Sequence, residues 1–251
     1  MKTHACKAGE HPDSCGRRSI LRTALGAAAL GGLGVAGLAS PGIAYAASLT
    51  KEQRDTLTPD QVIEMLKKGN ERFRAGESQR HDYLAQKRAT ASGQYPAAAI
   101  LSCIDSRAPA EIVMDAGIGD AFNARVAGNV PSEDIIGSLE FSCRLAGAKL
   151  VVVMGHTSCG AIKGAIDGAE LGNLTGLLNR IKPAVEATEY DGERTSKNID
   201  FVDTVARTNI RMAVNDIRQR SSVLAALERE KKIKIVGALY RFDGGKVEFL
   251  S

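Results

Sequence analysis

Cysteine is scarce in this sequence of 251 residues, which contains five. Cys6 and Cys15 lie near the start, in a segment interpreted below as a leader that is removed, so that Cys103, Cys143 and Cys159 remain. An odd number of cysteines argues against a disulfide framework in an oxidising compartment. At least some of these thiols must therefore have another role.

Beyond its first 46 residues, the chain has no excess of charge of either sign. It holds 33 Lys or Arg and 29 Asp or Glu, of which five basic and two acidic residues lie in the first 46, so that 28 basic and 27 acidic residues remain. A nucleic-acid-binding surface needs clustered positive charge, and this balance argues against one. Apolar residues make up 44% of the chain, which is enough for a sizeable core.

A long unbroken hydrophobic run is also missing. Thr23–Ala39 has no charged residue, but it is interrupted by glycine and is shorter than the ~20 apolar residues that a membrane helix prefers. It follows Arg17-Arg18 and precedes Ala44-Tyr45-Ala46, a small-x-small sequence that a signal peptidase cleaves. We therefore interpret residues 1–46 as a twin-arginine signal peptide, with an uncleaved anchor helix as the alternative. The domain 47–251 is then expected in the periplasm or secreted, without a permanent membrane span.

The remaining chain alternates short apolar strands with helices. The predicted strands are 97–102, 121–126, 149–154, 233–242 and 246–250. Helices are predicted from Pro59 onward and over 109–116, 132–146, 160–166, 174–187, 199–218 and 222–231. Such alternation indicates an α/β fold with a mostly parallel central sheet flanked by helices, and Asp243-Gly244-Gly245 predicts an antiparallel hairpin at the C-terminal end.

Chemically active side chains follow two of these strands. Cys103 comes after the first strand, and His156 and Cys159 come after the third. Functional sites gather beyond the carboxyl ends of parallel strands, although each residue alone would be an ordinary buried side chain. Two thiolates and one imidazole, with no fourth Cys or His beside them, indicate a catalytic zinc site that keeps one position for water.

Further groups lie close to these residues in the sequence. Asp105, two positions after Cys103, is placed to accept a hydrogen bond from zinc-bound water, and Arg107 is placed to hold that carboxylate. Gly160 begins a helix next to Cys159, so that backbone N–H groups can face an anion there. Cys143 lies in the middle of a predicted helix and is expected to fill the core.

These motifs resemble those of the β-class carbonic anhydrases, which carry Cys-x-Asp-x-Arg and, about fifty residues later, His-x-x-Cys. The resemblance extends from Leu57 to the C-terminus and includes Gly128-Asn129. It implies one zinc ion per chain on Cys103, His156 and Cys159, with Asp105 and Arg107 as the catalytic dyad. The implied reaction is the reversible hydration of carbon dioxide to bicarbonate and a proton by zinc-bound hydroxide.

The resemblance also implies substrate contacts and an assembly. Gln94 matches a glutamine that binds bicarbonate in plant-type members, and Phe122 and Phe141 match aromatic residues that line the carbon dioxide pocket. Phe141 would come from the partner subunit of a homodimer or higher oligomer. For both phenylalanines, a place in the ordinary core is an equal alternative.

Two positions depart from the family pattern. Ile104 replaces a small serine, and Val126 replaces an asparagine; neither change touches a predicted ligand or the dyad. Some members close the site by letting the dyad aspartate bind zinc, and Gln94 favours the open type. Hydrolysis of carbonyl sulfide or carbon disulfide on the same fold is the alternative activity, and a non-catalytic zinc-binding protein is a second alternative.

Overall fold

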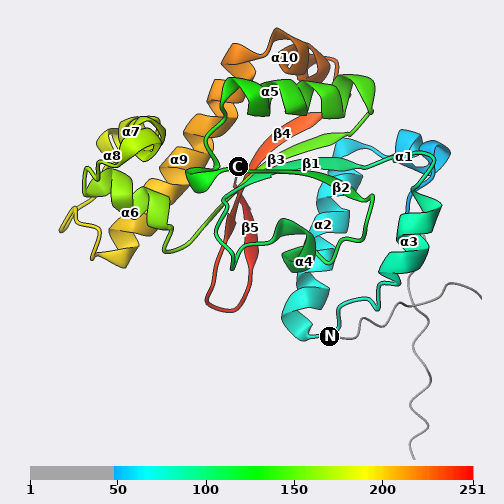
Figure 1. Cartoon of the computed structure of the whole chain (residues 1–251), viewed down its shortest axis with the longest axis horizontal. Coiled ribbons are helices and arrows are strands. Elements are labelled where there is room, and N and C mark those ends of the chain that lie inside the picture. Colours follow the sequence, from blue (N-terminus) through cyan, green and yellow to red (C-terminus); the bar gives the residue numbers. More distant parts are fainter. Residues whose placement is uncertain (1–47, 251) are drawn as a thin grey trace, which may run out of the picture. The chain divides into compact units, whose positions relative to one another are not determined.

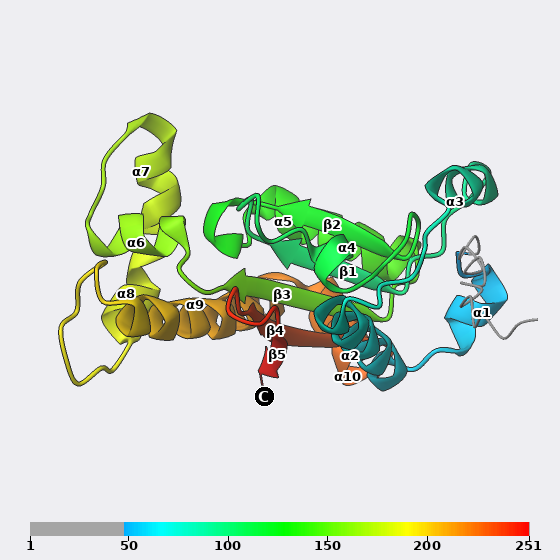
Figure 2. The same ribbon diagram turned by 90° about the horizontal axis from the view of Figure 1, so that it is seen from below.

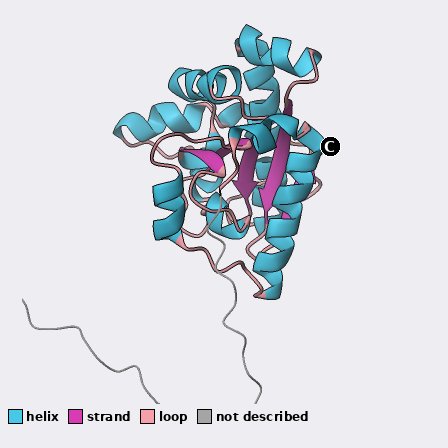
Figure 3. Cartoon of the chain, turned by 90° about the vertical axis from the view of Figure 1, so that its right-hand side faces the viewer, coloured by secondary structure: helices cyan, strands magenta, loops and turns pink. Residues whose placement is uncertain are grey.

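The computed structural model describes residues 48–250, so the predicted signal peptide with Cys6 and Cys15 lies outside the described residues. Its centre is a five-stranded sheet in the order β2-β1-β3-β4-β5 (Figures 1 and 3). Neighbouring strands run parallel from β2 to β4, and β5 runs antiparallel to β4. The strands are β1 (Ala98–Ser102), β2 (Ala121–Arg125), β3 (Leu150–His156), β4 (Lys234–Tyr240) and β5 (Val247–Leu250). The predicted α/β fold, with its antiparallel C-terminal pair, is confirmed.

Helices cover both faces of the sheet because successive strand residues point to opposite sides. Leu101 and Val153 pack in one hydrophobic cluster with α5 (Glu133–Glu140), α9 (Ile199–Arg220) and α10 (Ser222–Arg229). Ile100 and Val152 pack in the other cluster, with α2 (Pro59–Ala75) and α4 (Ala110–Val113). Figures 1 and 2 show α5 and α10 on one side of the strands and α2 with α4 on the other. The central strands are therefore buried on both faces, as parallel strands require.

The remaining elements are short. They are α1 (Lys51–Thr56), α3 (Tyr83–Ala89), η1 (Ala127–Asn129), the π-helix η2 (Phe141–Leu145), α6 (Gly160–Ile166), α7 (Gly172–Asn179) and α8 (Lys182–Ala187). None of the helices in the described part of the chain combines the length and hydrophobicity needed to span a bilayer.

Several helix ends differ from the prediction for local reasons. The helix predicted over 109–116 ends at Val113, because Asp115 adopts a left-handed backbone with φ +48°. The helix predicted over 132–146 is α5 followed by the wider turn of η2. The helix predicted over 174–187 is two helices, since Pro183 lacks an N–H and lies in the first turn of α8. The opening at Thr58 is confirmed, with its side chain accepting from Gln61 N in a capping box.

Candidate metal centre

Three side chains that could hold a metal ion meet at the carboxyl edge of the sheet. Cys103 directly follows β1, His156 is the last residue of β3, and Cys159 caps the start of α6. Their possible ligand atoms all lie within 4.8 Å of one another, and all three residues are buried. β3 ends two residues later than predicted, so His156 belongs to the strand rather than to the loop after it. The structure thus brings together the predicted ligand set.

The imidazole of His156 is arranged for a metal. Its Nδ1 lies 2.9 Å from the carbonyl oxygen of Thr157, which accepts a hydrogen bond if Nδ1 carries the proton. The other nitrogen, Nε2, then presents a lone pair. Nε2 is buried and has no hydrogen-bond partner among the described residues. A buried nitrogen without a partner is costly unless something accepts its lone pair, and a metal ion does so.

The two thiols also fit a divalent cation. The pKa of Cys103 is lowered, first by a hydrogen bond from Cys159 and then by His156 and the backbone N–H of Gly128, whose nitrogen lies 3.4 Å from the Cys103 sulfur. The pKa of Cys159 is raised by its interaction with Cys103 and by burial. One thiolate is therefore favoured by the protein alone. A bound zinc ion supplies the positive charge that favours the second, and two thiolates with one imidazole form a donor set that zinc accepts.

Asp105 and Arg107 form a bidentate ion pair beside these ligands. Arg107 donates from Nε to one carboxylate oxygen at 3.0 Å and from an NH2 group to the other at 2.8 Å, and its backbone N–H donates at 2.9 Å. These bonds hold the pKa of Asp105 at about 2. One carboxylate oxygen lies 3.8 Å from Nε2 of His156. An ionised acceptor is therefore fixed next to the ligand atoms.

Two further residues support the site and were not identified from the sequence. Arg125, at the end of β2, donates to the carbonyl oxygens of Cys103 at 2.9 Å and Asp105 at 2.6 Å, which fixes the loop after β1. The position of Arg125 at the carboxyl end of a strand next to β1 is the feature of the sequence that could have indicated this role. Phe242, just after β4, packs its ring against His156 and Arg107. No local pattern marked that contact.

The residues predicted to bind substrate are not all at this centre within one chain. Gly160 directly follows Cys159. Gln94, by contrast, is exposed and precedes the amino end of β1, whereas Cys103 follows its carboxyl end. Phe122 pairs with Ala99, four residues before Cys103 on an extended strand, which is roughly 13 Å. The role of these residues at the metal centre stays a prediction.

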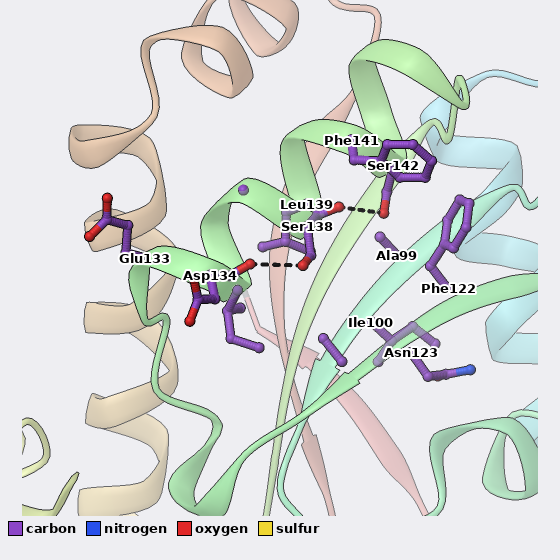
Figure 4. Close-up of a pocket in the computed structure, with 13 residues that line it drawn as sticks. Ala99, Ile100, Phe122, Asn123, Glu133, Asp134, Ser138, Leu139, Phe141 and Ser142 are labelled. Carbon is purple, nitrogen blue, oxygen red and sulfur yellow. Dashed lines mark hydrogen bonds between the residues drawn. The ribbon is translucent and has the colours of Figure 1, made fainter.

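Phe122 and Phe141 instead line a separate pocket over β1, β2 and α5, with a volume of about 850 Å³. Their ring centroids are 6.1 Å apart and nearly perpendicular, and Figure 4 shows them side by side at one end of the pocket. Phe141 is 52% exposed, so it is not a core residue in the single chain. Cys143 is buried, as expected from the sequence.

Comparison with known proteins agrees with this geometry. Residues 98–247 match the family model described as carbonic anhydrase. Carbonic anhydrase 2 of Mycobacterium tuberculosis is 36% identical over 187 residues, which cover 72% of this chain and 87% of that protein. The carbonic anhydrase of Mycolicibacterium smegmatis is 32% identical over 188 residues, covering 74% and 90%. A solved β-carbonic anhydrase of Aspergillus fumigatus is 26% identical with a TM-score of 0.60, covering 76% and 91%.

Proposed function

Because this chain belongs to the carbonic anhydrase family, we propose that Cys103, His156 and Cys159 hold its zinc ion and that Asp105 and Arg107 serve its reaction. The fold is that of the β class, and the protein is a zinc enzyme that interconverts carbon dioxide and bicarbonate. The observation that supports the ligand assignment best is the buried, unpartnered Nε2 of His156 within 4.8 Å of two cysteine sulfurs.

Zinc bound there supplies a Lewis acid that lowers the pKa of a water molecule toward neutrality, as it does in carbonic anhydrases with three histidine ligands. The chain's own residues orient that water. Asp105 would accept a hydrogen bond from a water molecule held there and so would orient it toward carbon dioxide. Since the pKa of Asp105 is about 2, this carboxylate stays ionised at neutral pH and acts as an acceptor rather than as a proton donor. Arg107 keeps both carboxylate oxygens in place, and Gly160 presents its backbone to the bicarbonate product.

The carbon dioxide pocket is proposed to form between two copies of the chain. Within one chain, Gln94, Phe122 and Phe141 lie away from the zinc ligands, and the ring of Phe141 is left half exposed beside a large pocket. A homodimer in which one copy supplies these side chains to the centre of the other accounts for both facts. Co-purified heterodimers of Asp105→Asn and Gln94→Ala subunits test this arrangement, because one of their two sites would be intact. When the two variant subunits pair at random, about half of the dimers are heterodimers, and each of these has one intact site. The mixture should then regain roughly a quarter of wild-type activity, and no recovery would refute shared sites.

Export is proposed from the sequence alone. Arg17-Arg18, the uncharged stretch 23–39 and the cleavable Ala44-Tyr45-Ala46 support a twin-arginine signal over residues 1–46, which lies outside the described residues. Replacing both arginines by lysine should leave the precursor inside the cell. Fractionation followed by N-terminal sequencing of the exported protein checks both export and the cleavage site at residue 46.

The catalytic assignment is tested with purified protein that contains its zinc. Asp105→Asn keeps the shape of the side chain but removes its charge, and it should lower carbon dioxide hydration by roughly 100-fold at neutral pH while zinc stays bound. Stopped-flow hydration and metal analysis measure the two quantities. Unchanged hydration in Asp105→Asn would refute the role of the dyad. Sulfide release from carbon disulfide that exceeds carbon dioxide hydration in the wild type would favour the alternative activity.

A further inference from the structure

The turn between two of the zinc ligands is strained. Ser158, between His156 and Cys159, has φ +54°, in the left-handed region. A residue with a Cβ atom is unfavourable there, and serine is not among the types enriched in that conformation. Such a conformation persists only where the surroundings enforce it. The turn matters for the site because it redirects the chain from the end of β3 to the start of α6, and so lets both ligands face one point.

Asp203 provides the enforcing contact. It lies in α9, 45 residues further along the chain, and its Oδ1 accepts a hydrogen bond of 2.7 Å from the backbone N–H of Ser158. This is a charge-assisted bond to an N–H that precedes the first turn of a helix. In the described part of the chain, Asp203 forms no ion pair, because the nearby cations Arg207 and Arg241 bind Glu248 at 2.6 Å and Asp243 at 2.7 Å. Its carboxylate is therefore committed to the turn.

Neighbouring contacts do not replace this one. Thr157, which lies between His156 and Ser158, is tied to the end of β4: its N–H donates to Tyr240 O at 3.0 Å, and its hydroxyl accepts from Phe242 N at 3.0 Å. These bonds fix the exit from β3 but not the left-handed residue itself. Among residues 48–250, only the bond from Asp203 in α9 acts directly on the backbone N–H of Ser158.

We infer that Asp203 is a positioning residue for zinc, which holds the left-handed turn at Ser158 so that His156 and Cys159 bind the same ion. The inference rests on the proposed ligand set. It predicts that the bond matters through its geometry. An uncharged side chain that accepts the same hydrogen bond at position 203 should hold the turn nearly as well. A residue that adopts the left-handed conformation without strain at position 158 should make the bond dispensable.

The test measures how fast zinc leaves the purified holoenzyme for a coloured chelator in excess. Asp203→Ala should release zinc roughly 10- to 100-fold faster, the range seen when groups behind metal ligands are lost. Asp203→Asn keeps an oxygen acceptor and should stay close to the wild type. Adding Ser158→Gly to Asp203→Ala should restore most of the slow release, because glycine adopts the left-handed turn without cost. Asp200→Ala is the matched control, because Asp200 is an exposed carboxylate in the first turn of the same helix, and it should change the rate of zinc release little.

The outcomes separate the two claims. A wild-type protein without stoichiometric zinc would refute the metal centre and this inference with it. A wild type that binds zinc and an Asp203→Ala variant that releases it equally slowly would refute the role of Asp203 alone. Failure of Ser158→Gly to restore slow release would also overturn it, since strain at the turn would not be what Asp203 opposes. If the Asp203→Ala single variant fails to fold but the double variant with Ser158→Gly folds, the inference is supported. If the double variant also fails to fold, the inference is overturned.

Discussion

The guanidinium of Arg107 lies over the ring of Phe242, with its central carbon 4.2 Å from the ring centroid. The same guanidinium forms two hydrogen bonds to Asp105. The Phe242 ring also packs against that of His156, with centroids 5.0 Å apart. One aromatic side chain thus contacts both Arg107 of the proposed dyad and His156 of the proposed ligand set, and it limits where the guanidinium can lie.

Replacing Phe242 by leucine should therefore impair catalysis although the residue does not touch substrate. A cation–π contact at a partly exposed site is worth about 1 kcal/mol, so we expect a loss of roughly 5- to 10-fold in kcat/KM for carbon dioxide hydration, with zinc retained. Phe242→Tyr keeps the aromatic face and should retain most of the activity. Stopped-flow assays with metal analysis measure both. Equal activity of Phe242→Leu and wild type, or equal impairment of the leucine and tyrosine variants, would contradict this role.

The grouping of Cys103, His156 and Cys159 could be predicted from the sequence because it depends on topology. Cys103 and His156 end neighbouring parallel strands, and the carboxyl ends of parallel strands share one edge of the sheet. Phe242 could not be placed in the same way, because its contacts arise from packing across the sheet edge. The turn at Ser158 was equally hidden, since serine does not mark a left-handed residue as glycine does. Local sequence thus indicates which groups meet, whereas their precise orientation depends on distant residues such as Asp203.

The helix predicted over 132–146 differs from the structure because the hydrophobic patterns of an α-helix and of a short π-helical turn look alike. Ser132 and the acidic pair Glu133-Asp134 predict the start of one helix over 132–146, but the chain widens into a π-helical turn at Phe141–Leu145. A single extra residue per turn hardly changes the hydrophobic pattern, so the sequence does not distinguish the two. Phe141, the first residue of this wider turn, lies next to Phe122 at the pocket. That the two rings face a second copy of the chain is expected only from the family resemblance.

Cys143 should be chemically inert in the folded protein. It is buried, and burial raises its pKa to about 12, so almost no thiolate is present at pH 8. Native protein treated with N-ethylmaleimide should therefore remain unlabelled at Cys143 for hours, as measured by peptide mass spectrometry. The same protein in guanidinium chloride should be labelled within minutes and serves as the control. Rapid labelling of the native protein would show that this thiol is more accessible than the structure indicates.

The edge of β4 is protected by an ion pair. β5 pairs only with residues 237–240 of β4, and nearer the start of the strand the backbone of Ile235 is satisfied by side chains. Glu228 accepts from its N–H at 3.1 Å, and Arg218 donates to its carbonyl oxygen at 2.8 Å. The two side chains also bind each other through two hydrogen bonds of 2.8 and 2.9 Å. They take the place of a neighbouring strand.

This arrangement predicts a pH-dependent contribution to stability. Burial raises the pKa of Glu228, but the bonds from Arg218 and Ile235 outweigh it, so the net pKa is lowered in the folded protein. The stabilisation is therefore present above the ordinary pKa of glutamate and is lost as pH falls through the lower folded value. Glu228→Gln should lower the free energy of unfolding by about 1 kcal/mol at pH 7, a figure reduced for partial solvent exposure. The difference from wild type should shrink below pH ~4.5.

Denaturant titrations at several pH values measure this difference. Glu230→Gln is the matched control, because Glu230 pairs with Lys232 on the surface and both side chains are more than half exposed. An exposed pair contributes little, so this variant should leave the free energy of unfolding close to that of the wild type at any pH. Equal effects of the two substitutions would show that the Glu228 pair does not protect the strand edge.

The approach of α2 to α4 gives the sharpest test of the packing. A Cβ atom at Gly69, in the middle of α2, would lie 1.9 Å from the backbone oxygen of Met114. The next residue, Asn70, is locked in place by hydrogen bonds to Val113 O and Gly245 O, each 2.9 Å. The helix therefore cannot move away from α4 without breaking buried bonds. A backbone atom in the way cannot yield as a flexible side chain does.

Gly69→Ala should accordingly lower the free energy of unfolding by about 2–3 kcal/mol, even though alanine favours a helix over glycine by about 1 kcal/mol. Gly176→Ala is the matched control, since position 176 lies within α7 and has open space around it. There only the helix preference acts, and stability should rise by up to about 1 kcal/mol. Urea unfolding of both variants measures effects of opposite sign. If Gly69→Ala proved as stable as the wild type, α2 and α4 would have to lie further apart than the structure places them, and the bonds of Asn70 could not both be present.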